Sequence, residues 1–206
     1  MDVDVLLFQI GAAVFAVTGV LAAARQNMDV MSFVIIGVVT AVGGGTLRDL
    51  ILDQPLFWLE DVSYLYVASL AAAATFFFEK RFRAPLCVFL YLDAVATALF
   101  TVLAIEKTLR LGYTSGIAVL MGVITGIGGG IIRDLLTGQP TLIMRRELYM
   151  TPILLGGAAY AVLYAGAWLD ASVAAWLTIL LITALRFGAI RWDWSFPDWL
   201  THRPLK

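Results

Sequence analysis

Seven long runs of apolar residues are the feature that most constrains this fold. They cover residues 5–24, 31–52, 62–78, 86–105, 115–136, 150–168 and 172–185. A bilayer crossing takes about 20 residues, so each run matches one helical span, although the third and seventh are short. Strands of a membrane barrel would instead alternate apolar and polar positions over about 10 residues, which these runs do not do. The sequence therefore predicts an all-α integral membrane protein with seven transmembrane helices.

The composition agrees with this fold class and excludes several functions. Of the 206 residues, 61% are hydrophobic and 14% are charged, whereas soluble domains have about 45–50% apolar and about 25% charged residues. The formal net charge of −1 argues against a nucleic-acid partner, which would require a basic surface. The single cysteine, Cys87, and the single histidine, His202, are too few for a Cys/His metal site or a serine-histidine triad. We therefore expect neither enzyme activity nor a bound metal or cofactor.

The loops between the runs differ in charge, and this difference predicts the orientation. If the two arginines inside predicted spans are set aside, ten lysines and arginines fall on one side of the membrane and two on the other. The ten are Arg25, Lys80, Arg81, Arg83, Arg145, Arg146, Arg186, Arg191, Arg203 and Lys206. The two are Lys107 and Arg110. Because cytoplasmic loops carry the excess of lysine and arginine, we expect the N-terminus outside and the C-terminus in the cytoplasm.

An internal repeat divides the chain. The segment 37–55 recurs at 122–140, an offset of 85 residues, with eleven of its nineteen positions identical. The same offset pairs Phe15 with Phe100, so the sequence predicts a first three-helix repeat over 1–84, a second over 85–169, and a seventh helix with a tail over 170–206. Three spans per repeat is an odd number, so the second copy must enter the membrane from the opposite face. This predicts an inverted repeat of three plus three helices, an architecture found in many transport proteins.

Each repeat contains three successive glycines within a predicted span. They are Gly43, Gly44 and Gly45 in the second helix and Gly128, Gly129 and Gly130 in the fifth. Glycine costs a helix about 1 kcal/mol relative to alanine, and broken helices at matching places in two halves indicate a substrate or ion site. We therefore expect both helices to be broken at the triplets. The alternative is that the glycines allow close helix packing.

An arginine-aspartate pair follows each triplet, as Arg48 with Asp49 and Arg133 with Asp134. A charge at membrane depth costs roughly 2.5–3.5 kcal/mol on insertion scales, so these side chains are expected to find partners inside the protein. Since adjacent residues on a helix do not face each other, we expect crossed pairs between the repeats, Arg48 with Asp134 and Arg133 with Asp49. The alternative places both pairs in water at the span ends.

Further polar residues lie in or beside the predicted spans. Thr40 and Thr125 occupy matching positions, and Asp93 lies in the fourth span where the first repeat has Phe8. Carbonyls at the ends of half-helices suit a cation, and these three side chains could add oxygen ligands along its path. Asp93 could instead be a helix-start carboxylate at the membrane surface.

Two copies of Gly-Gly-Gly-x-x-Arg-Asp, 85 residues apart in a chain of about 200, resemble the prokaryotic trimeric intracellular cation channels (TRIC) and the related bacterial proteins called glycine transporters. The resemblance implies a homotrimer in a bacterial or archaeal plasma membrane, in contact with lipid. It also implies a potassium-permeable pore in each protomer at the glycine triplets, with the two arginine-aspartate pairs beside it. Animal channels have a lysine-based motif where this chain has Arg48 and Asp49, so their gating and lipid regulation are not carried over.

Two functions stay open at this point. A monovalent cation channel would use backbone carbonyls and threonine hydroxyls to replace part of the water around potassium or sodium. A secondary transporter of a small zwitterion such as glycine would use the same inverted repeat to bind a carboxylate.

Overall fold

The structure, a computed structural model, describes residues 3–24, 26, 28–82, 84–145, 147–165, 169–197 and 199. Among the cations used to predict the orientation, four arginines and one lysine lie outside these ranges. They are Arg25, Arg83, Arg146, Arg203 and Lys206, and the single histidine, His202, lies outside as well.

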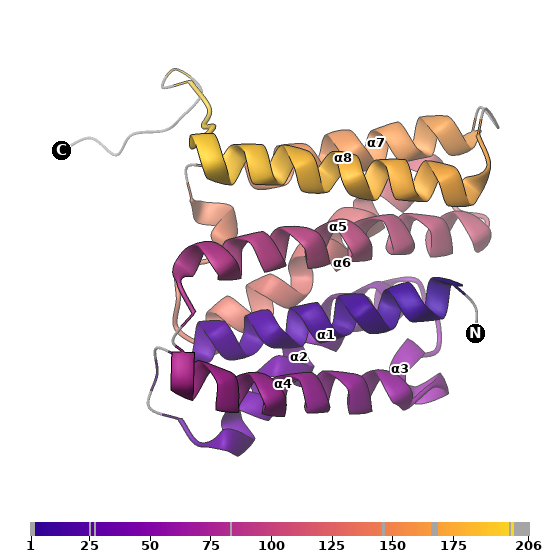
Figure 1. Ribbon diagram of the computed structural model, residues 1–206. Helices are drawn as coiled ribbons and strands as arrows, with labels where there is room; N and C mark the ends of the chain where they lie inside the picture. Colours follow the sequence, from indigo (N-terminus) through magenta and orange to yellow (C-terminus); the bar gives the residue numbers. More distant parts are fainter. Residues whose placement is uncertain are drawn as a thin grey trace.

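The described chain is helical almost throughout (Figure 1). Its elements are α1 (Val3–Ala23), α2 (Val30–Ile51), α3 (Phe57–Glu60), α4 (Ser63–Phe82), α5 (Leu86–Arg110), α6 (Ser115–Leu136), the 3-10 helix η1 (Leu142–Met144), α7 (Met150–Ala165) and α8 (Ala171–Trp192). Each predicted run forms one long helix. By length and composition, α1, α2, α5, α6 and α8 could cross a bilayer, whereas α4 and α7 count as shorter apolar helices. The number of seven crossings therefore stays a prediction.

Helices α2 and α6 end in the same way. The chain leaves each helix through one residue with positive φ, Asp53 at 51° and Gly138 at 63°. The next amide then bonds back to the helix, with Gln54 N donating to Asp49 O at 2.8 Å and Gln139 N donating to Asp134 O at 2.9 Å. This turn brings the following segment back against the arginine-aspartate pairs.

The two halves of the bundle run in opposite directions. Figure 1 shows α1 starting at the end marked N and α5 starting at the other end. Helix α1 packs against α2, α4 and α5, while α6 packs against α2, α5 and α7. Two hydrophobic cores result, one centred on α1, α2 and α4 and the other on α5 to α8. The repeat-related rings of Phe15 and Phe100 stack between the halves, with their centroids 5.2 Å apart.

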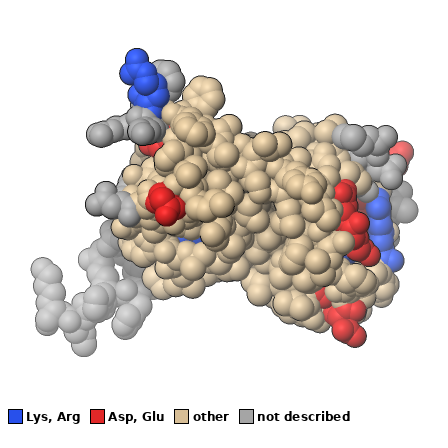
Figure 2. Space-filling model, turned by 90° about the horizontal axis from the view of Figure 1, so that it is seen from below, with Lys and Arg blue, Asp and Glu red and all other residues tan. Residues whose placement is uncertain are grey.

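The surface is apolar between two polar ends. In Figure 2, charged side chains gather at the two ends of the face shown, and the band between them carries almost no charge. We call the end that carries Arg81, Arg145 and Arg191 the arginine-rich end. One predicted loop cation proves to be internal, because Arg186 is fully buried in α8 with its guanidinium 4.4 Å from the Tyr149 ring centroid.

The expectation that the glycine triplets break their helices is wrong. Both α2 and α6 are helical through the triplets and beyond them to Ile51 and Leu136. In an apolar environment an interrupted helix would leave backbone groups without hydrogen bonds, so a continuous helix is favoured.

Candidate functional site

The glycine triplets lie where α2 crosses α6 with the two backbones in contact. A Cβ atom added to Gly44 would meet the carbonyl oxygen of Thr125, and one added to Gly129 would meet that of Thr40. Both would be closer than 3.0 Å, a separation that real Cβ atoms essentially never show. The close-packing alternative is therefore the correct one, since only glycine lets the helices approach this closely.

The other triplet members have different surroundings. A Cβ on Gly43 would lie 2.9 Å from Ile132, and one on Gly128 would lie 3.1 Å from Leu47. Gly45 faces the ring of Phe57. Gly130 is the exception, because its nearest neighbours would be polar and 3.5 Å or more away.

Thr40 and Thr125 are buried at the same crossing. Their hydroxyls donate to backbone carbonyls one turn earlier, Ile36 O and Met121 O, both at 2.6 Å. The hydroxyl protons are therefore already engaged within each helix. The oxygen lone pairs remain the groups that either threonine could offer to an ion.

The first charge cluster follows Gly45. The Nε and Nη2 atoms of Arg48 lie 2.8 Å from Oδ1 of Asp49. The same oxygen accepts from Lys107 Nζ at 2.9 Å, and Oδ2 accepts from the Phe57 amide at 3.0 Å. Arg48 and Asp49 are fully buried, and the guanidinium lies near the rings of Phe8 and Phe57, 5.8 and 5.9 Å from their centroids.

The second charge cluster follows Gly130 and is built in the same way. Arg133 Nε donates to Asp134 Oδ1 at 2.8 Å, and Asp134 Oδ2 accepts from the Leu142 amide at 3.1 Å. Arg133 Nη1 donates to Asp93 Oδ1 at 2.8 Å and to the Thr18 hydroxyl at 3.0 Å.

Two aromatic side chains complete the second cluster. The Tyr149 hydroxyl donates to Asp93 Oδ2 at 3.1 Å, and the ring of Phe89 lies 4.6 Å from the Arg133 guanidinium. Asp93 is fully buried within the protein, and its depth in the membrane stays a prediction.

These contacts correct the predicted pairing. Each arginine binds the aspartate next to it rather than the one in the other repeat. The guanidinium group is on a long flexible side chain and can turn back to the neighbouring carboxylate near the helix end. The alternative of pairs in water is also wrong, because the four residues are at most 3% exposed.

The two clusters differ in formal charge. Among the ion-paired side chains, the first holds two cations and one carboxylate, because Lys107 joins it, whereas the second holds one cation and two carboxylates, because Asp93 joins it. A further buried cation, Arg186, lies against the Tyr149 ring of the second cluster. At the offset of 85, Lys107 corresponds to Ala22 and Asp93 to Phe8. Each repeat thus supplies the same pair, and α5 of the second repeat supplies both third charges, which are opposite in sign.

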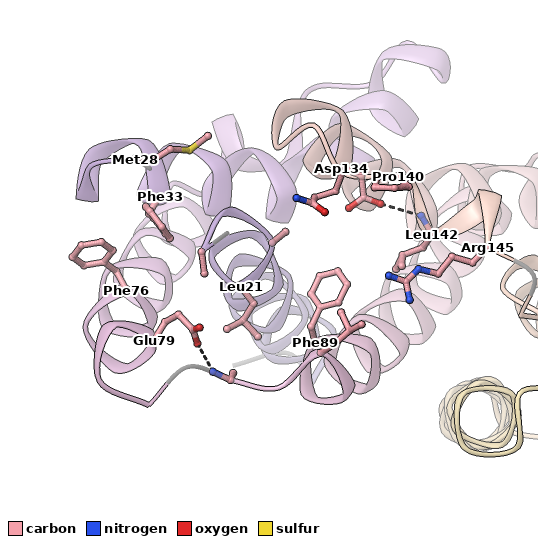
Figure 3. Close-up of a pocket in the computed structure, with 15 residues that line it drawn as sticks. Leu21, Met28, Phe33, Phe76, Glu79, Phe89, Asp134, Pro140, Leu142 and Arg145 are labelled. Atoms are coloured by element: carbon pink, nitrogen blue, oxygen red, sulfur yellow. Dashed lines mark hydrogen bonds between the residues drawn. The ribbon is translucent and has the colours of Figure 1, made fainter. Parts of the chain in front are cut away.

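A cavity of about 700 Å³ opens at the arginine-rich end and reaches the second cluster at Asp134 (Figure 3). Its lining comes from α1, α2, α4, α5, the C-terminal end of α6 and the segment that follows α6, together with short connections between helices. The residues are Leu21, Ala22, Ala24, Met28, Phe33, Phe76, Glu79, Ala84, Leu86, Phe89, Asp134, Gln139, Pro140, Leu142 and Arg145.

Sequence reasoning did not identify several members of these clusters. The charge pattern counts Lys107 among the loop cations, although the first repeat has the uncharged Ala22 at the matching position, and this difference between the repeats is a usable signal. Tyr149 was also recognisable, since it matches Tyr64 at the repeat offset. Thr18 and Phe89 have no such signal, because the residue 85 positions away in the other repeat is of a different chemical type in each case.

Comparisons with known proteins agree on one family. The family model described as "Glycine transporter" matches residues 5–80 and 90–165. The inner membrane protein YadS of Escherichia coli is 40% identical over 190 residues, which cover 91% of this chain and 92% of YadS. A membrane protein of the same family from Vibrio cholerae is 39% identical over 93% of this chain and 81% of its own length.

Solved structures extend this result. The TRIC trimeric intracellular cation channel orthologue from Rhodobacter sphaeroides superposes with a TM-score of 0.89 at 40% identity, covering 94% of this chain and all of that one. A second TRIC cation channel gives a TM-score of 0.86 at 29% identity, covering all of this chain and 99% of the other. The chain therefore belongs to the bacterial membrane protein family whose model is described as "Glycine transporter", within the TRIC superfamily.

Proposed function

We propose that this protein is a monovalent cation channel, permeable to potassium, with a pore inside each protomer between the two repeats. The related structures at 40% and 29% identity are described as cation channels. The observation that carries the proposal is the second charge cluster, where two buried carboxylates share one arginine at the end of an open cavity. A surplus carboxylate favours a cation over an anion at that point.

The proposed ion path passes beside the crossing of α2 and α6, because the two backbones in contact leave no space between them in this state. Arg48 and Arg133 each lie four residues beyond the central glycine of their helix, which is about 6 Å along the axis. Because the two helices run in opposite directions (Figure 1), the clusters flank the crossing on opposite sides. The cavity gives access to the second cluster, and Lys107 covers Asp49 in the first. We propose that this arrangement is a closed state in which Lys107 blocks the far entrance.

The proposal includes a topology and an assembly. The halves form an inverted repeat, seven helices cross the membrane, the arginine-rich end faces the cytoplasm and the N-terminus lies outside. The opposite directions of α1 and α5 and the surplus of cations at one end support this. The Rhodobacter sphaeroides orthologue is described as trimeric, which supports a homotrimer. Chemical crosslinking in detergent tests the trimer.

The decisive experiment is single-channel recording of purified protein in planar bilayers across a potassium chloride gradient. We expect discrete openings that reverse toward the potassium equilibrium potential. A Lys107→Met variant should give larger openings, which would assign the current to this chain rather than to a contaminant. Reversal toward the chloride potential, or silent membranes with both proteins intact on gel filtration, would overturn the proposal. Replacing potassium by sodium then measures the selectivity.

One observation favours a second candidate, transport of glycine. Among the described residues, Nη1 of Arg48 and Nη2 of Arg133 are buried without a hydrogen-bond partner, and guanidinium groups bind carboxylates well. The description of the family model points the same way. Saturable uptake of labelled glycine into proteoliposomes, without unitary currents, would favour the transporter.

A further inference from the structure

We propose that the cavity at the arginine-rich end is a binding site for a primary alkylammonium ion, held with its ammonium group against Asp134. Binding of the ion does not require that the protein be a channel, whereas the block of current by the ion rests on the proposed channel function.

The protein itself supplies the template for this site at its other end. The Lys107 ammonium group lies 2.9 Å from Asp49, the carboxylate that matches Asp134 at the repeat offset. The residue that matches Lys107 is Ala22, and Ala22 lines the cavity. One end thus carries a built-in alkylammonium side chain, and the other has space in its place.

The walls of the cavity suit an alkyl chain. Leu21, Phe33 and Phe89 line it together with Met28, and Figure 3 shows Leu21 and Phe89 on either side of the space that leads to Asp134. The volume of about 700 Å³ falls within the range of about 300–1,000 Å³ typical of small-molecule sites. Lysine stems pack along apolar surfaces in the same way while their ammonium groups keep polar partners.

The charges around the cavity favour a cation at its inner end. Figure 3 shows Glu79 across the space from Asp134 and Arg145 on the side of Asp134; the formal charges of Glu79 and Arg145 cancel in the sum over the lining. At the inner end Asp134 belongs to the cluster in which Asp93 supplies a second carboxylate for one arginine. An ammonium group can donate a charge-assisted hydrogen bond there, as Lys107 does to Asp49.

Titration calorimetry with n-hexylammonium on the detergent-solubilised protein tests the proposal. The Ala22→Lys variant places a second built-in ammonium group at the site and should weaken binding by at least about tenfold. Ala24→Lys, which adds the same charge elsewhere on the lining, is the matched control and should weaken binding less. Equal affinity for wild type and Ala22→Lys would overturn the proposal.

A ligand series keeps the test valid if Ala22→Lys does not fold. On the wild-type protein, n-hexylammonium should bind more tightly than n-hexyltrimethylammonium, which cannot donate a hydrogen bond, and more tightly than hexanoate. Tighter binding of hexanoate would assign the cavity to Arg145 and an anion, and binding of neither ion would leave the cavity without this function. Both outcomes overturn the proposal.

Recording separates this inference from the channel proposal. In wild-type channels n-hexylammonium should block from one side of the membrane, and in Lys107→Ala channels from both sides, because the matching space is then open at each end. Channels that conduct without block, with no calorimetric binding, would refute the inference alone. Specific binding to a protein that never conducts would refute the channel and leave the site.

Discussion

The Nζ atom of Lys107 lies 2.9 Å from Oδ1 of Asp49, and Lys107, which belongs to the second repeat, stands at the position that the first repeat fills with Ala22. The side chain of Lys107 is 29% exposed, while Asp49 is fully buried. A partly exposed cation on a buried carboxylate is held by one contact and can leave it without unfolding its helix. The two ends of the proposed path therefore differ in access.

Replacing Lys107 by methionine should raise the unitary potassium current severalfold. The change removes a positive charge from the proposed entrance and frees Asp49 to attract cations, while methionine keeps the length of the side chain. Recording at matched voltage measures it. Arg110→Met is the control, because Arg110 lies on the same helix but is 59% exposed and pairs with Glu106. Equal increases in both variants would point to a general surface-charge effect and against a specific gate at Lys107.

Alanine substitutions in the triplets should have opposite effects at different positions. Gly44→Ala and Gly129→Ala drive a Cβ into a carbonyl of the facing helix, and overpacking of this kind costs about 1–3 kcal/mol. Gly130→Ala meets nothing closer than 3.5 Å and should gain up to about 1 kcal/mol from helix propensity. Thermal unfolding in detergent measures both. A loss of stability in all three variants would contradict the packing role.

The sequence was sufficient to predict the class of fold and the positions that matter. Apolar runs predicted every long helix, because span length is set by the bilayer and little else. The repeat predicted which residues are equivalent, and Phe15 and Phe100 do meet between the halves. The apolar runs and the repeat can both be recognised in the sequence without knowledge of any side-chain conformation.

The partners of the charged residues could not be predicted in this way. Adjacent residues on a helix were assumed not to interact, yet the reach of Arg48 and Arg133 allows each to bind its neighbour. The triplets were read as breaks because glycine weakens a helix, but contact between two backbones outweighs that preference. The first error concerns the reach of a side chain within one helix, and the second concerns packing between two helices, which a local propensity does not contain.

Asp29 should make the start of α2 sensitive to acid. Its carboxylate accepts from the Ser32 amide at 2.8 Å, and this hydrogen bond lowers the pKa of Asp29 below its ordinary value of 3.8. A lowered pKa means that the contribution to stability is present above the unfolded value and is lost as the pH falls through the folded one. The Asp29→Asn variant keeps a capping oxygen but cannot titrate. Its melting temperature should therefore fall less than that of the wild type between about pH 5 and about pH 2.5, a range that extends about one unit above and below the pKa of an ordinary carboxylate. Parallel melting curves for the two proteins would show that the cap does not titrate.

Changing Asp93 to asparagine should reduce both cation preference and stability. The asparagine oxygen can still accept from Arg133 and its amide nitrogen can donate to the Tyr149 hydroxyl oxygen, but the second cluster loses its surplus carboxylate. Breaking a buried pair costs about 3–5 kcal/mol, and the lower end applies because Arg133 keeps Asp134. The reversal potential in a potassium chloride gradient should move toward zero. Tyr149→Phe is the matched control, since it removes one hydrogen bond worth about 1 kcal/mol and leaves every charge in place. If Tyr149→Phe shifts the reversal potential as much as Asp93→Asn, the surplus carboxylate does not set the selectivity.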